Sequence, residues 1–272
     1  MDTVDGNCIG SSKSDVKTVK QNRTFVSPSQ DDKNTIYYNM NKKTTGLALI
    51  FNHEQFDSPK CPSRNGTNFD RSNLAIRLNG LGFHVKVFQD LSYNQLKKEI
   101  IAASGRDHSD YDCFIMVVLT HGDPGILYAK DRVYQYENLW VPFSDKNCPT
   151  LVGKPKLFFI QACQGTEADD GITLYRTEID GQPANSHLIL TEPDVLIAYS
   201  TAPGFYSWRR KDEGSWFINA LCMELDKISE DYDLLTLLTF VNQRVALDYE
   251  SNFPEDVKKH LKKQIPCITI EN

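Results

Sequence analysis

Residues 156–165 read KLFFIQACQG, a compact apolar run that ends abruptly in polar and small residues. The part from Leu157 to Ile160 is typical of a strand that is buried on both faces of a sheet. Three further runs, at 47–51, 114–119 and 195–199, have the same character. Because strands of this kind belong to parallel sheets covered by helices, the sequence predicts an α/β fold.

Helical patterns lie between and after these runs. Leu74, Leu78 and Leu81 recur at helical spacing. Ser92 and Gln95 form a plausible capping box before the next apolar face. Two later stretches, 215–225 and 234–247, have broad apolar faces, and 264–270 is β-like. Strands that alternate with helices favour a three-layer fold, with a mostly parallel central sheet and helices on both faces.

Composition narrows the class of protein. The chain has 272 residues, 40% of them hydrophobic, which is ordinary for a packed globular protein. Its formal charge of −6 disfavours nucleic acid as a partner. The sequence has neither a run long enough to cross a membrane nor an apolar N-terminal signal, so we expect a cytoplasmic protein without a membrane partner.

Seven cysteines are scattered without a C-x-x-C pair, which favours free thiols in a reducing compartment. A zinc hydrolase with His108, Cys113 and His121 as ligands is a remote alternative. The spacing of these three residues matches no known zinc site, so we expect neither a metal nor another cofactor.

Two strand ends carry reactive side chains, His121 after one apolar run and Cys163 after another. Sites of open parallel sheets form at the carboxyl ends of strands. An imidazolium beside a thiol can stabilise the thiolate and later protonate a leaving amine. Gly122 and Gly165 would let a substrate carbonyl approach the backbone. We expect the amides of Gly122 and Cys163 to stabilise an oxyanion. Taken singly, a cysteine or a histidine at such a position is more often structural.

The pentapeptide at 161–165 fits the caspase pattern Q-A-C-[RQG]-G, which has a histidine upstream; here His121 precedes Cys163 by 42 residues. Several further stretches, in the family's order, resemble executioner caspases: 154–158 (KPKLF), 120–122 (THG), 200–204 (STAPG), 207–209 (SWR) and 214–217 (GSWF). The resemblance runs from about Tyr37 to Ile268. It implies a caspase-like fold and a cysteine endopeptidase that acts in the execution phase of apoptosis, with His121 and Cys163 as catalytic residues.

The resemblance also implies how a substrate is selected. Caspases require aspartate before the scissile bond, and its carboxylate would be held by Arg64, Arg209 and Gln161. A guanidinium fork suits a carboxylate because it can bind both oxygens. Without the resemblance, Arg64 would be interpreted as a solvated loop arginine.

Neighbouring substrate positions map onto a short stretch of this chain. Tyr206, Trp208 and Trp216 match aromatic residues that line pockets in the family, although large aromatics also fill cores. Ser207 and Arg210 are further candidate substrate-binding residues. Arg210 departs from the vertebrate pattern, which has asparagine there, and this weakens any inference about the outer substrate residues.

Activation by proteolysis is the third implication. We expect a flexible prodomain at 1–35, a large subunit at 36–170, an intersubunit linker at 171–192 and a small subunit at 193–272. Asp180 is the expected maturation site, with Asp170 and Asp5 as further cleavage candidates. The resemblance implies an initiator caspase as activator, inhibitor-of-apoptosis proteins as regulators and a homodimer of large and small subunit pairs.

Two alternatives remain open at this point. The family pattern continues beyond 264–268, so a truncated, poorly active isoform that binds and regulates full-length caspases is one of them. The other is a metacaspase-like or paracaspase-like enzyme, which would cut after arginine or lysine. Arg64 and Arg209 at the pocket positions disfavour the latter, because they suit an acidic substrate.

Overall fold

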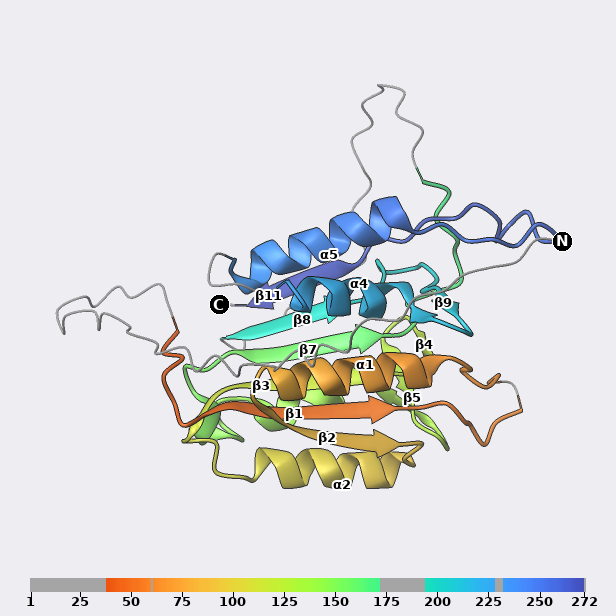
Figure 1. The fold of residues 1–272 in the computed structure, drawn as a ribbon. Coiled ribbons are helices and arrows are strands. Elements are labelled where there is room, and N and C mark those ends of the chain that lie inside the picture. Colours follow the sequence, from red (N-terminus) through yellow and green to blue (C-terminus); the bar gives the residue numbers. More distant parts are fainter. Residues whose placement is uncertain (1–37, 60, 172–193, 228–231, 272) are drawn as a thin grey trace, which may run out of the picture. The chain divides into compact units, whose positions relative to one another are not determined.

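The computed structural model describes residues 38–59, 61–171, 194–227 and 232–271, all within the compact unit Tyr38–Asn272. A six-stranded sheet in the order β11-β8-β7-β3-β1-β2 runs through this unit (Figure 1). The strands are β1 (Thr44–Asn52), β2 (Phe83–Gln89), β3 (Tyr111–Leu119), β7 (Lys156–Gln161), β8 (Val195–Tyr199) and β11 (Cys267–Glu271). All neighbours are parallel except β11 and β8, which confirms the predicted mostly parallel sheet.

Helices cover both faces of the sheet, as predicted. The main ones are α1 (Thr67–Gly80), α2 (Tyr93–Ser104), α4 (Trp216–Leu225) and α5 (Leu234–Asp248). Alternate residues of β3 enter separate cores: Phe114 and Met116 pack with α2, whereas Ile115 and Val117 pack with α1, α4 and α5. Figure 1 shows the latter three helices on the near face. This two-sided burial explains why β3 lacks polar alternation in the sequence.

The capping box of α2 is confirmed, since Ser92 accepts from the Gln95 amide and Gln95 reaches back to Ser92. Strand β2 was missed, because it lies at the sheet edge and only Phe83 in it is buried. The sequence patterns also gave no sign of the short elements: β4 (Gly122–Asp123), β5 (Ile126–Tyr128), β6 (Val133–Gln135), α3 (Glu137–Trp140), η1 (Val141–Phe143), η2 (Pro149–Leu151), β9 (Arg209–Arg210) and β10 (Gly214–Ser215).

Strand register places the two reactive side chains at one edge of the sheet. Leu119 of β3 pairs with Gln161 of β7, and His121 and Cys163 each follow two residues later. Asn52, the last residue of β1, also pairs with Leu119, so the loop at 53–66 leaves the sheet at the same edge. No helix among the described residues has the length and apolar character needed to cross a membrane.

Candidate active site

The Cys163 thiol lies half-buried against the backbone of Ser207, whose amide donates to Cys163 Sγ at 3.4 Å. Burial raises the pKa of the thiol above its ordinary value, although the Ser207 amide and the charge of Arg64 partly oppose this rise. Ser207 is held in turn, because its hydroxyl donates to Ser200 Oγ at 2.8 Å. The thiol is therefore held in a fixed position, and its burial favours the neutral form.

The His121 ring is fixed by a backbone carbonyl. Its Nε2 lies 2.7 Å from the Pro62 oxygen, and since a carbonyl only accepts, Nε2 carries the proton and Nδ1 is the basic nitrogen. The Phe56 ring lies 4.8 Å from the imidazole, centroid to centroid. Burial lowers the pKa of His121, with the Pro62 carbonyl partly opposing. A neutral imidazole of defined tautomer is suited to act as a general base.

Gly122 approaches the nucleophile so closely that a side chain would not fit. A Cβ at this position would lie 2.6 Å from the Cys163 carbonyl oxygen. The Tyr128 amide donates to the His121 carbonyl, so the next pair of the β4–β5 ladder is a non-hydrogen-bonded one. The Gly122 N–H therefore points away from β5.

The sequence argument for the second glycine, Gly165, needs correction. A side chain there would collide with the carbonyl of Gly204, so the space is taken by the protein backbone and not by a substrate. The Gly204 amide also donates to Gln164 O at 2.9 Å. Gly165 thus lets two loops of the site pack against each other.

Arg64 brings a buried positive charge to the site. Its side chain is 3% exposed, and its Nη1 donates to the His53 carbonyl at 3.0 Å and to Thr67 Oγ1 at 2.9 Å. Among the described residues it forms no ion pair with a carboxylate. Burial, and then the nearby charge of Arg209, lower the pKa of Arg64 to about 9. A buried cation of this kind favours an anionic ligand.

Arg209 and Gln161 lie close by. A guanidinium nitrogen of Arg209 donates to the Asn65 carbonyl, and the side chain is half-buried. Gln161 Nε2 donates to Ser207 Oγ at 2.7 Å, whereas its buried Oε1 has no partner among the described residues. The three predicted aspartate ligands thus come from the loop at 53–66, strand β9 and the end of β7.

The aromatic candidates form a connected row. The Trp208 ring lies 5.9 Å from both the Tyr206 ring and the Trp216 ring, and Trp216 stacks on Tyr249 at 5.5 Å. Gln264, which sequence reasoning missed, accepts from the Trp208 amide at 2.6 Å. Trp216 is 3% exposed, so it supports the row from within the core.

Arg210 and Asp170 each carry an ion partner in this structure. Arg210 Nη1 lies 2.6 Å from Glu213 Oε2, and both side chains are about half exposed. Asp170 pairs with Lys262, and the backbone amide of Lys263 donates to the carbonyl of the neighbouring Asp169 at 2.8 Å. Two further cleavage candidates, Asp180 and Asp5, lie outside the described residues.

A thiol and an imidazole at the carboxyl edge of a mostly parallel sheet, beside the buried Arg64 and the half-buried Arg209, fit a cysteine peptidase. Residues 45–272 match the family model described as caspase domain, and the chain belongs to this family.

Individual relatives place the chain among effector caspases. It is 52% identical over 265 residues to Caspase-1 of Spodoptera frugiperda, covering 97% of this chain and 87% of that protein. It is 49% identical over 249 residues to Caspase drICE of Drosophila melanogaster, covering 91% and 74%. The crystal structure of the Spodoptera frugiperda protein matches with a TM-score of 0.81 and 53% identity, over 88% of this chain and 93% of that one. The chain is a cysteine-type endopeptidase with effector caspase function, and its family implies aspartate-containing substrates and dimerisation.

Proposed function

We propose that this chain cleaves proteins on the carboxyl side of aspartate, with Cys163 as nucleophile and His121 as its acid/base partner. The observation that carries the proposal is the buried Arg64, whose charge acts on both residues. Arg64 forms no ion pair among the described residues, although the charge of the buried Asp70 acts on it. A substrate aspartate supplies a direct ionic partner for this guanidinium.

The chemistry starts from a neutral pair. As Cys163 Sγ attacks the substrate carbonyl carbon, the thiol proton passes to His121 Nδ1, because Nε2 already holds a proton toward Pro62. The amides of Gly122 and Cys163 stabilise the oxyanion. The imidazolium then protonates the leaving amine as the C–N bond breaks and a thioester remains. Water, deprotonated by His121, hydrolyses the thioester and restores the thiol.

Selectivity follows from charge and from unmet hydrogen bonds. Arg64 and Arg209 offer guanidinium donors, and Gln161 adds an amide group beside Ser207. Asparagine has nearly the shape of aspartate but leaves both cations unpaired, so it should bind poorly. A basic residue meets two like charges in a buried place and should be rejected.

The neighbouring substrate side chains meet a different surface. Trp208 and Tyr206 present an aromatic wall for the residue before the aspartate, and Trp216 backs it from the core. Ser207 contributes mainly by fixing the thiol and Gln161. The exposed pair of Arg210 with Glu213 is worth only roughly 0–1 kcal/mol, so Arg210 stays available for an acidic outer residue.

Maturation by cleavage at Asp180 completes the proposal, with an initiator caspase as the activating protease and Asp170 and Asp5 as secondary sites. The Lys262 contact makes Asp170 a poorer site than its exposure suggests. We place the protein in the cytoplasm, regulated by inhibitor-of-apoptosis proteins. β11, at the sheet edge, is the strand through which two subunit pairs would form the homodimer.

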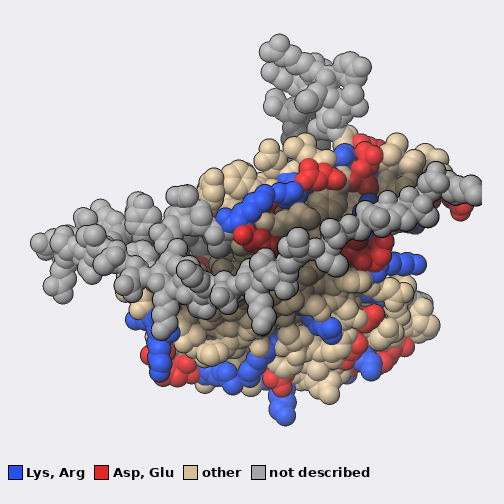
Figure 2. Space-filling view, in the orientation of Figure 1, with Lys and Arg blue, Asp and Glu red and all other residues tan. Residues whose placement is uncertain are grey.

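On the face drawn in Figure 2, basic and acidic side chains lie interspersed.

The test uses purified protein, before and after cleavage at Asp180, and matched fluorogenic tetrapeptides that end in aspartate, asparagine or arginine. We expect turnover of the aspartate peptide alone, greater after cleavage, from a species with the mass of a dimer. The Cys163→Ala protein should fold and show no turnover. Equal hydrolysis of the aspartate and asparagine peptides would contradict the proposal, as would activity that survives Cys163→Ala.

A further inference from the structure

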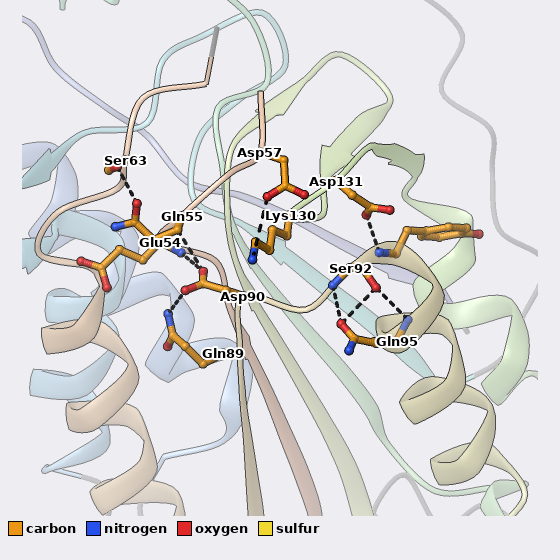
Figure 3. Close-up of polar contacts among 11 residues, drawn as sticks. Glu54, Gln55, Asp57, Ser63, Gln89, Asp90, Ser92, Gln95, Lys130 and Asp131 are labelled. Atoms are coloured by element: carbon orange, nitrogen blue, oxygen red, sulfur yellow. Dashed lines mark hydrogen bonds and ion pairs between the residues drawn. The ribbon is translucent and has the colours of Figure 1, made fainter. Parts of the chain in front are cut away.

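Asp90, at the end of β2, holds the first turn of the loop at 53–66. One carboxylate oxygen, Oδ1, accepts from two successive amides, Glu54 N at 2.6 Å and Gln55 N at 2.9 Å. The other oxygen accepts from Gln89 Nε2 at 2.9 Å. Figure 3 shows the Asp90 side chain pointing at this turn, with all three bonds drawn. The carboxylate is thus bound to the loop at two consecutive peptide groups.

The opposite ends of the same two peptide groups hold Arg64. The His53 carbonyl, which shares a peptide group with the Glu54 amide, accepts from Arg64 Nη1 at 3.0 Å. The Glu54 carbonyl, which shares a peptide group with the Gln55 amide, accepts from the Arg64 backbone amide at 2.9 Å. Each peptide group is therefore polarised by an anion on one side and by Arg64 on the other. Hydrogen bonds in such chains strengthen one another.

This arrangement matters because Arg64 forms no ion pair with a carboxylate among the described residues, yet it is buried. Its position depends on the acceptors that the loop provides. Partial burial raises the pKa of Asp90, but its hydrogen bonds outweigh this effect and hold the pKa below the usual range. Asp90 is therefore anionic at neutral pH. Asp90 also has a left-handed backbone, with φ of 50°, a conformation that aspartate and asparagine tolerate better than most residues.

We propose that Asp90 is a positioning residue for aspartate recognition, which fixes Arg64 through the peptide groups 53–54 and 54–55. The inference rests on the proposed role of Arg64 in binding the substrate carboxylate. Asp90 does not contact the substrate in this account. The charge of Asp90 strengthens the hydrogen bonds that the His53 and Glu54 carbonyls accept from the guanidinium and the backbone amide of Arg64.

The test is Asp90→Asn in the full chain, cleaved at Asp180. Asparagine keeps the left-handed backbone and one carbonyl acceptor but loses the charge and the second acceptor oxygen. We expect KM for the aspartate tetrapeptide to rise about tenfold, equivalent to ~1.4 kcal/mol, while kcat changes less. The matched control is Asp131→Asn, since Asp131 accepts from the Tyr93 amide at 2.7 Å in the same view but holds α2 instead of the loop (Figure 3). The control should keep its KM within about twofold.

A double-mutant cycle separates positioning from a general structural role. Binding of a fluorescent peptide that ends in a free aspartate is measured in Cys163→Ala proteins that carry Asp90→Asn, Arg64→Ala or both. We expect Asp90→Asn to weaken binding only while Arg64 is present. Equal losses in both backgrounds, or an unchanged KM in Asp90→Asn, would overturn the inference and leave the role of Arg64 intact. Unchanged binding in Arg64→Ala alone would instead overturn the pocket assignment, and this inference with it.

Discussion

Replacing Arg64 by methionine should lower aspartate cleavage by at least about 100-fold while changing the stability of the fold only slightly. The fall of the Arg64 pKa from its ordinary value to about 9 corresponds to roughly 5 kcal/mol of unfavourable charge burial in the folded protein at neutral pH. Its hydrogen bonds to His53 O and Thr67 Oγ1 offset this by about 1.5–3 kcal/mol each. The expected change in the free energy of unfolding therefore lies between a loss of ~1 kcal/mol and a gain of ~2 kcal/mol.

The sign of the pH dependence follows from the same pKa. A base whose pKa is lower in the folded state binds fewer protons there than in the unfolded chain, so folding is penalised at every pH below about 9. This penalty fades as the pH rises from about 9 toward the ordinary pKa of an arginine. Any stability that Arg64→Met gains at pH 7 should accordingly shrink above pH 9.

The assay is urea unfolding in the Cys163→Ala background, where self-cleavage cannot interfere, with activity measured in the active background. The matched control is Arg77→Met, which removes an ion pair with Asp226 at 2.6 Å on the surface. The control should lose about 1 kcal/mol or less and keep its activity. Arg64→Met should lose at least about 100-fold in kcat/KM, because an aspartate carboxylate then enters a buried pocket with one cation fewer. A stability loss above ~3 kcal/mol with activity retained would show that Arg64 is a structural residue.

Three further experiments test the oxyanion donor, the resting thiol and a buried lysine of β7. Gly122→Ala should lower kcat by roughly 100-fold with little change in KM, because its methyl group would push against the Cys163 carbonyl and displace an oxyanion donor; an unchanged kcat would refute this donor. Alkylation of Cys163 by iodoacetamide should accelerate about tenfold per pH unit up to at least pH 9, since burial raises the thiol pKa and lowers that of His121; a plateau between pH 6 and 8 would indicate a resting thiolate–imidazolium pair. Lys156→Ala should cost about 3 kcal/mol in urea unfolding, because it empties a buried site and leaves Asp145, 3.1 Å away, without this partner; a loss below ~1 kcal/mol would contradict that reasoning.

The buried strands could be read from the sequence because both of their faces are covered, as in β3 and β7, so that apolar residues follow one another without interruption. Strand β2 was not predicted, because its edge position leaves most of its side chains at least partly exposed and so removes the continuous apolar pattern. The capping box at Ser92 was predictable because helix caps are local.

The site was predictable only where side chains carry the chemistry. His121 and Cys163 follow strand ends, so their proximity follows from the parallel sheet. Arg64 became a candidate only through the family resemblance, because a loop arginine has no local sign of burial. The sequence gives no sign of the roles of the Pro62 carbonyl and of the peptide groups 53–54 and 54–55, which Asp90 binds. Backbone groups are the same at every residue, and only the tertiary fold brings these ones to the site.

The most direct test of the account is labelling of the cleaved protein with a peptide chloromethyl ketone that ends in aspartate, followed by peptide mapping in a mass spectrometer. We predict a single adduct on Cys163 among the seven cysteines, and slow or no labelling by the matched asparagine reagent. Labelling of another cysteine, or equal labelling of Cys163 by both reagents, would contradict the assignment of this thiol and of its aspartate pocket.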